Sequence, residues 1–95
     1  MFKVNTDGTG FTNLHSFTAT PDPFYTNSDG ANPEAALILS GNTLYGTAYS
    51  GGSSGVGTVF AVNTDGTGFT NLYSFTATSS FPYTNSDGAN PIAGL

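Results

Sequence analysis

The feature that most constrains this chain is an internal repeat with a period of 58 residues. When the 95-residue sequence is shifted by 58 positions, residues 1–37 align with residues 59–95 without a gap, and 28 of the 37 pairs are identical. The differences cluster at residues 21–24 and 79–82, which suggests a variable loop. A period of this size is typical of solenoids, propellers and arrays, whose units bury apolar surface against their neighbours.

Within one period, the pattern of apolar residues favours strands and excludes helices. No segment keeps apolar residues at helical spacing for more than two turns, and Gly, Thr, Asn or Pro interrupts every stretch. The turn pairs Gly41-Asn42 and Asp65-Gly66 separate apolar runs and predict hairpins. We expect strands at residues 35–39, 43–49, 58–63 and 69–76, with counterparts of the last two at 2–5 and 11–18.

Four short antiparallel strands per period are the content of one β-propeller blade. The expected fold class is therefore all-β, with propeller blades of four-stranded antiparallel sheet and an incomplete ring in the single chain 1–95. In blade order the chain begins on a third strand and ends on a first strand at residues 92–95. A second complete period would need the counterparts of residues 38–58.

This strand order predicts assembly with copies of the same chain. We interpret the chain as a truncated piece of a propeller or as a self-assembling subunit, natural or engineered. Unpaired strand edges promote association, and a head-to-tail contact must close into a ring to avoid an open fibre. Propellers hold four to eight blades, so a homo-oligomer of three or four chains would supply about six or eight.

The same residues resemble the bacterial GloVer tandem repeat. The family pattern of Gly-Leu-Ile, Leu-Tyr-Gly-Thr, Gly-Gly, Gly-Thr-Val-Phe and Leu-Tyr-Ser-Phe is matched at residues 36–38, 44–47, 51–52, 57–60 and 72–75. The chain departs from this pattern at Ala36, where the Gly is kept only in the second copy as Gly94, and in the insert at residues 76–90. The resemblance implies propeller blades of extracellular or cell-surface bacterial proteins, and it carries over no catalytic residues.

Charge and hydropathy exclude two classes of partner. Lys3 is the only Lys or Arg, against six acidic residues, and the net charge is −5. A nucleic-acid partner would require a basic patch, so none is expected. No apolar run approaches the roughly 20 residues that span a bilayer, and no basic-then-apolar signal segment opens the chain. We therefore expect no membrane partner, and a signal for a secreted parent protein would lie elsewhere.

The strongest local motifs are two oxygen-rich loops and two Asp-Gly turns. Residues 27–32 (NSDGAN) recur as residues 85–90, and the turns surround Asp7 and Asp65. Oxygen-rich loops can hold Ca²⁺, but none of these has the acidic positions or the terminal bidentate Glu of an EF-hand loop. Asp-Gly is first of all a turn device. We interpret the motifs as turns and expect neither a metal site nor another cofactor.

His15 is the only histidine, and Tyr73 replaces it in the second copy. A metal site needs several convergent ligands, and a Ser-His-Asp triad would need this one His. A packing role is therefore favoured for His15. We expect no enzymatic activity.

Carbohydrate binding is the alternative to a structural or interaction scaffold. Tyr25 and Tyr83 can stack on sugar rings in a lectin-like propeller, with Asp29 and Asp87 beside them as further candidate ligand contacts. The other interpretation of the aromatic residues is packing between blades, because aromatic side chains dominate core burial. The same two interpretations, sugar stacking and packing, apply to Tyr45, Tyr49, Phe24 and Phe81. A non-catalytic, self-assembling scaffold is the leading prediction.

Overall fold

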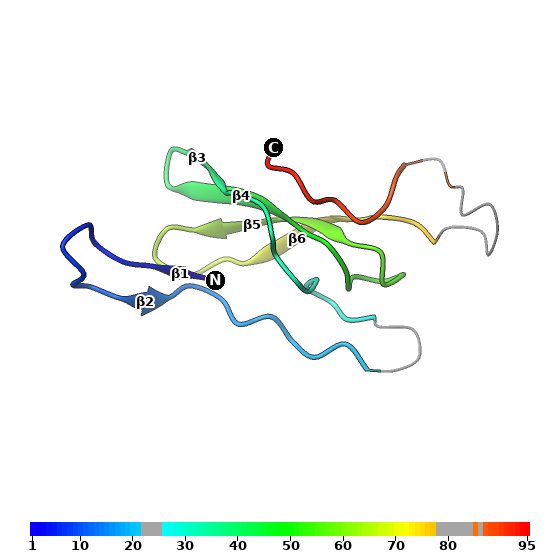
Figure 1. The fold of residues 1–95 in the computed structure, drawn as a ribbon, viewed down its shortest axis with the longest axis horizontal. Helices are drawn as coiled ribbons and strands as arrows, with labels where there is room; N and C mark the ends of the chain where they lie inside the picture. The colour runs from blue at the N-terminus through cyan, green and yellow to red at the C-terminus, as the bar shows by residue number, and fades with distance from the viewer. Residues whose placement is uncertain (22–25, 78–84, 86) are drawn as a thin grey trace.

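A computed structural model of the chain describes residues 1–21, 26–77, 85 and 87–95. These residues form two antiparallel sheets and no helix, so the all-β prediction is confirmed. The smaller sheet pairs β1 (Phe2–Lys3) with β2 (Thr12–Asn13). The larger sheet follows the chain in the order β3 (Ile38–Ser40), β4 (Thr43–Ala48), β5 (Thr58–Asn63) and β6 (Thr70–Ser74), as Figure 1 shows. No helix that could cross a membrane occurs in this part of the chain.

β5 is the central strand, and its side chains alternate between the two faces of the sheet. Thr58, Phe60 and Val62 point to one face, which we call the Phe60 face, and all three are fully buried. The cross-strand partner of Phe60 on β4 is Gly46. Val59 and its partner Thr47 point to the opposite face, which we call the Thr47 face.

Two long segments cover these faces from opposite sides. We call residues 14–37 the N-terminal arm and residues 72–95 the C-terminal arm. The N-terminal arm lies on the Phe60 face, where Phe17 packs edge-on against Phe60 at 5.4 Å between ring centroids. The C-terminal arm reaches the Thr47 face, where the Ala93 carbonyl accepts a hydrogen bond from the Thr47 hydroxyl. The central strands β4 and β5 thus lie between the N-terminal arm, below the sheet in Figure 1, and the end of the C-terminal arm, above it.

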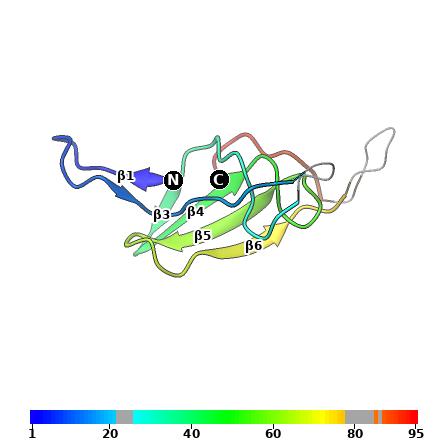
Figure 2. The same cartoon turned by 90° about the horizontal axis from the view of Figure 1, so that it is seen from below.

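The molecule is elongated, with principal extents of 48 × 25 × 21 Å. The β1–β2 hairpin contributes to the long dimension, since it projects beyond one end of the four-stranded sheet in Figure 2. The buried apolar residues belong to the sheet and the N-terminal arm: Leu14, Ala48, Phe60, Ala61 and Val62. The apolar residues of the hairpin, in contrast, are exposed.

Several strand boundaries differ from the sequence-based expectation. The strand expected at residues 35–39 begins at Ile38, because Leu37 leaves the sheet to pack over Gly46. The strand expected at residues 92–95 does not form, and its counterparts at residues 34–37 form none either. Both copies therefore agree, and the expectation of a terminal first strand was wrong.

The fourth strands also end earlier than expected. The expected strand at residues 11–18 is reduced to Thr12–Asn13, and that at residues 69–76 is reduced to Thr70–Ser74. In each copy the threonine at the expected end binds an aspartate with its N–H and hydroxyl groups instead of extending the ladder. The third strand of the hairpin is likewise short, because the expected residues 2–5 are reduced to Phe2–Lys3, and β2 is the one partner strand of β1 among the described residues.

Candidate functional site

The first oxygen-rich loop is held together by its own side chains. The Asn27 side-chain oxygen accepts the N–H groups of Gly30 and Gly52, and its amide nitrogen donates to the carbonyls of Thr18 and Gly30. Asp29 is 6% exposed, and its carboxylate accepts hydrogen bonds from the Thr18 hydroxyl at 2.6 Å and the Thr18 N–H at 3.1 Å. His15 Nε2 lies 2.9 Å from the same carboxylate. The loop thus fastens residues 15–18 to residues 27–30.

The second copy repeats this arrangement on the surface. Asn85 donates to the carbonyls of Thr76 and Gly88 and accepts the Gly88 N–H, as Asn27 does in the first copy. The Asp87 carboxylate accepts the N–H and hydroxyl groups of Thr76, and the Tyr73 hydroxyl donates to it. The contacts of Asn27 with Thr18 and Gly30, and those of Asp29, therefore recur in the second copy, with Tyr73 in the place of His15.

Hydrogen bonding shifts the acidity of these groups. Burial raises the pKa of Asp29, but hydrogen bonds from the Thr18 hydroxyl, His15 and the Thr18 N–H outweigh it, and the pKa is lowered overall. The Tyr73 hydroxyl and Thr76 lower the pKa of Asp87, and the same contact raises the pKa of Tyr73. Both carboxylates are therefore ionised at neutral pH and engaged in the fold.

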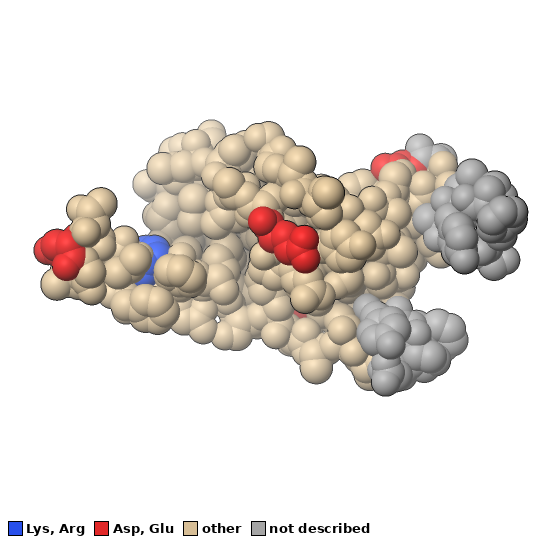
Figure 3. All heavy atoms as spheres, viewed as in Figure 1, with Lys and Arg blue, Asp and Glu red and all other residues tan. Residues whose placement is uncertain are grey.

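The Asp-Gly turns behave in the same way. Asp7 accepts the N–H and hydroxyl groups of Thr9, and Asp65 accepts those of Thr67, in each case with a hydroxyl contact of 2.6 Å. In the part of the chain that the structure describes, no group of three or more His, Cys, Asp or Glu residues is placed to hold a metal ion. Charged side chains are few and scattered on the face shown in Figure 3.

The most distinctive site is a cluster of four rings where the N-terminal arm meets the Phe60 face. His15 lies flat on Phe69 with 3.7 Å between ring centroids, and Phe17 meets Phe60 and Phe69 edge-on. We call His15, Phe17, Phe60 and Phe69 the four-ring cluster. The arm contributes the first two rings and strands β5 and β6 supply or flank the other two, so the cluster joins the first copy of the repeat to the second.

Both halves of this cluster occur a second time, separately. Phe2 and Phe11, the counterparts of Phe60 and Phe69, stack at 5.3 Å and 24°, against 5.5 Å and 27° for the pair in the cluster. Tyr73 and Phe75 are the counterparts of His15 and Phe17. They meet edge-on at 78°, against 83° for the pair in the cluster.

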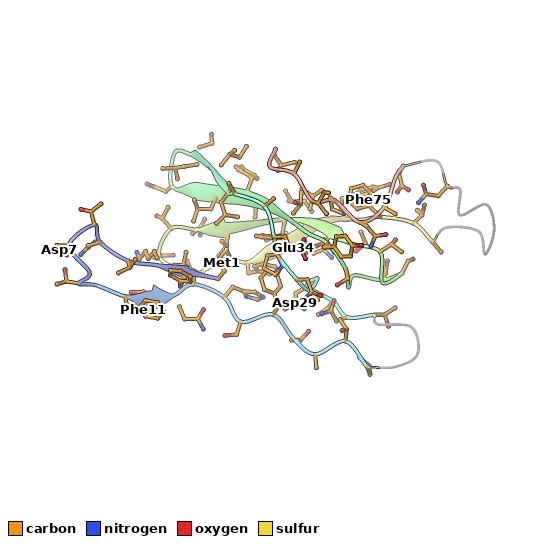
Figure 4. The ribbon with its side chains drawn as sticks, in the orientation of Figure 1. Met1, Asp7, Phe11, Asp29, Glu34 and Phe75 are labelled. Atoms are coloured by element: carbon orange, nitrogen blue, oxygen red, sulfur yellow. The ribbon has the colours of Figure 1, made fainter. Side chains whose placement is uncertain are left out.

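The two separate halves lie far apart. Figure 4 shows Phe11 on the β1–β2 hairpin, in one half of the molecule, and Phe75 beyond the end of β6, in the other half. Phe2 is 61% exposed and Phe11 is 66% exposed. Each half is therefore assembled in the cluster geometry without its complementary half.

The candidate ligand contacts predicted from the sequence lie in different surroundings, and some of them lie outside the described residues. Tyr25, Tyr83, Phe24 and Phe81 lie outside the described residues. Asp29 is buried against Thr18 and His15, while Asp87 lies nearer the surface against Tyr73. The carbohydrate alternative depends on Tyr25 and Tyr83, and the described contacts of the two aspartates are internal ones.

The sequence argument missed the four-ring cluster, although it favoured packing roles for His15 and the aromatic residues. The available signal was the 58-residue offset itself, which relates His15 and Phe17 to Tyr73 and Phe75. The contact partners of these rings depend on which face each arm covers, and strand alternation alone does not specify that.

No family model, curated protein or solved structure matches the chain. Membership of the GloVer repeat family therefore remains a hypothesis based on the sequence pattern.

Proposed function

We propose that this chain is a non-catalytic β-propeller repeat unit that assembles head to tail with copies of itself into a ring, as a structural or interaction scaffold. The observation that carries the proposal is the four-ring cluster, which is complete inside the chain and present as two preformed halves at its ends. One chain offers Tyr73 and Phe75, and the next offers Phe2 and Phe11.

The exposure of equivalent residues supports this pairing. Phe60 and Val62 are fully buried, whereas their counterparts Phe2 and Val4 are 61% and 45% exposed. On the complementary side, Leu14 is 5% exposed, and its counterpart Leu72 is 52% exposed. Exposed apolar surface of this kind marks association sites. A second copy would bury these residues by the same contacts that already bury their counterparts.

The ring follows from the polarity of the contact. The two surfaces differ, so the contact is heterologous, and such contacts generate either rings or open filaments. In this proposal, the four-stranded sheet β3 to β6 would serve as one blade of each chain, and the two-stranded sheet β1 and β2 as part of another. Three or four chains would bring the total to about six or eight blades, within the range of known propellers. The GloVer hypothesis agrees with this architecture and suggests an extracellular or cell-surface bacterial parent.

The test measures mass in solution for the chain and for matched variants. We expect the unmodified chain to be a discrete oligomer at micromolar concentration by light scattering. Phe11→Asp and Leu72→Asp each remove one of the two surfaces at an exposed position and should give monomers. Leu39→Asp, at an exposed position on β3 outside both surfaces, is the control and should remain oligomeric.

Mixing the two monomeric variants tests the polarity. Each variant retains the surface that the other lacks, so an equimolar mixture should form a dimer that does not grow further. A folded, monodisperse monomer of the unmodified chain would refute assembly. Persistence of the oligomer in both variants would refute the proposed surfaces.

A further inference from the structure

The β1–β2 hairpin reproduces half of the four-stranded sheet in register. Phe2 pairs with Asn13 and Lys3 with Thr12. Their counterparts pair in the same way, since Phe60 lies opposite Asn71 and Ala61 lies opposite Thr70. β1 is therefore a short version of β5, and β2 is a short version of β6.

The two strands differ at their other edge. β5 pairs along that edge with β4, which places Gly46 opposite Phe60 and Tyr45 opposite Ala61. β1 pairs with no strand other than β2 among the described residues. An open edge of this kind presents backbone N–H and C=O groups to a further strand.

A cavity adjoins β1. It has a volume of about 180 Å³ and is lined by Met1, Phe2, Pro33, Ala35 and Leu37. All five side chains are apolar, which suits the side chains of an added strand.

The walls of the cavity identify what would fill it. Ala35 is the counterpart of Ala93, whose carbonyl contacts Thr47 on β4. Met1 is the counterpart of Val59, the cross-strand partner of that same Thr47. In the four-stranded sheet, β4 therefore lies between Ala93 and Val59. Beside the hairpin, the corresponding space between Ala35 and Met1 is the cavity.

We propose that the open edge of β1 and the adjoining cavity form an acceptor site for a β-hairpin with the sequence of residues 38–48, supplied by a further repeat unit. The added strand would pair with β1 in the register of β4 with β5, which places Gly46 of the incoming hairpin opposite Phe2. This is strand addition, in which backbone hydrogen bonds supply affinity and side-chain pockets supply specificity. The site lies on the strand edge of β1 and shares Phe2 with one ring surface of the proposed assembly, whereas the other ring surface, at Leu72, Tyr73 and Phe75, is separate from it.

Glycine is required at position 46 of the incoming strand. A Cβ atom placed on Gly46 in the complete sheet would lie 2.9 Å from the ring of Phe60. At the acceptor site, Phe2 takes the place of Phe60. A larger side chain at this position should therefore abolish binding while leaving the rest of the hairpin sequence intact.

The experiment titrates a fluorescein-labelled peptide of residues 36–49, with terminal lysines for solubility, into the full chain and follows fluorescence anisotropy. We expect saturable binding. The peptide carrying Gly46→Val should bind at least tenfold more weakly. In the protein, Ala35→Phe fills the cavity and should weaken binding at least tenfold, whereas the matched change Ala93→Phe in the second copy should alter it less than twofold.

The outcomes separate this site from the assembly. Binding should persist in the Leu72→Asp variant, whose assembly is disabled, so a failed ring and a failed acceptor site give different results. Absence of saturable binding would overturn the acceptor site. Equal binding of the Gly46→Val peptide, or equal effects of Ala35→Phe and Ala93→Phe, would overturn the register and the location.

Discussion

At the scale of single residues, the two copies form the same contact between an aromatic ring and an aspartate with different side chains. His15 and Tyr73 occupy equivalent positions, and each reaches an aspartate 14 residues further along the chain. Each ring also meets a phenylalanine two residues on, edge to face. The exchange of His for Tyr therefore preserves an aromatic ring with a polar contact to a carboxylate. That shared geometry gives a physical reason for a packing role at both positions.

We expect Asp29 to matter more for stability than Asp87. Asp29→Ala removes a buried, charged acceptor from the N–H and hydroxyl groups of Thr18, and should lower the free energy of unfolding by about 2 kcal/mol. Asp87→Ala is the matched change in the second copy, and the Asp87 carboxylate is more open to water than that of Asp29, so the loss should be smaller. Urea denaturation of the two variants measures the difference. Equal losses of unfolding free energy would show that the burial of Asp29 does not increase its contribution to stability.

Stability should also fall in acid. Hydrogen bonds lower the pKa values of Asp7, Asp29, Asp65 and Asp87 below the ordinary value of 3.8. A carboxyl whose pKa is lowered by folding stabilises the native state above its unfolded pKa, and this stabilisation is lost as the pH falls through the folded pKa. The melting temperature should change little from pH 7 to pH 5 and decline below about pH 4. A rise in melting temperature between pH 4 and pH 2 would contradict this account.

At the scale of elements, two glycines shape the β3–β4 hairpin for different reasons. Gly41 makes the turn at φ +61°, a left-handed conformation, and a Cβ atom there would meet nothing within 4 Å. Gly46 has no such backbone constraint. Its Cβ atom would lie 2.4 Å from Leu37 and 2.9 Å from Phe60. The first glycine is needed for backbone conformation, and the second leaves space for the N-terminal arm.

The two glycines should respond differently to alanine. Gly41→Ala should cost about 1 kcal/mol, because the strain is confined to one residue. Gly46→Ala should cost about 1–3 kcal/mol, because the added methyl group overpacks the contact between the arm and β5. Thermal denaturation compares the variants, and Leu37→Ala combined with Gly46→Ala should recover part of the loss. No recovery would show that the arm does not depend on this space.

Strand prediction succeeded where the backbone chemistry is local. The bounds of β5 match the expected residues 58–63, and both Gly-containing hairpins form where the turn pairs predict them. It failed at residues 35–37 and 92–95, which are apolar enough for strands but leave the sheet. Contacts distant in sequence, such as Leu37 with Gly46 and Thr18 with Asp29, decide those boundaries. The local pattern of apolar residues does not reveal such contacts, so it cannot predict these strand boundaries.

At the scale of the whole molecule, the apolar surface is unevenly distributed. The buried residues of the four-stranded sheet lie on β4 and β5, while the hairpin exposes Phe2, Val4 and Phe11 and β6 exposes Leu72 and Tyr73. From the sequence we could predict that the chain has two ends with unpaired strands. We could not predict which side chains would pair between those ends, because that depends on how the aromatic rings pack in both copies. Assembly through these surfaces would be driven by apolar burial, since Lys3 is the only Lys or Arg.

Salt should therefore strengthen the assembly. Every chain carries a net charge of −5, so association brings like charges together, and added salt screens their repulsion. The dissociation constant measured by sedimentation velocity should decrease between 0.05 and 0.5 M sodium chloride. An increase would indicate that ion pairs between chains dominate the contact, contrary to the surfaces proposed above.

The near-identity of the two arms has a consequence for the order of folding. During folding, the Phe60 face meets two competitors, its own N-terminal arm and the C-terminal arm of another chain, which share most of their residues. The tethered arm acts at an effective concentration that reaches the millimolar range for short flexible connections. Dilute chains therefore close on themselves before they associate. Refolding at higher protein concentration should instead trap chains that have exchanged their arms. In a less repetitive protein, differences in sequence prevent such an exchange between chains. In this protein, dilution has to prevent it.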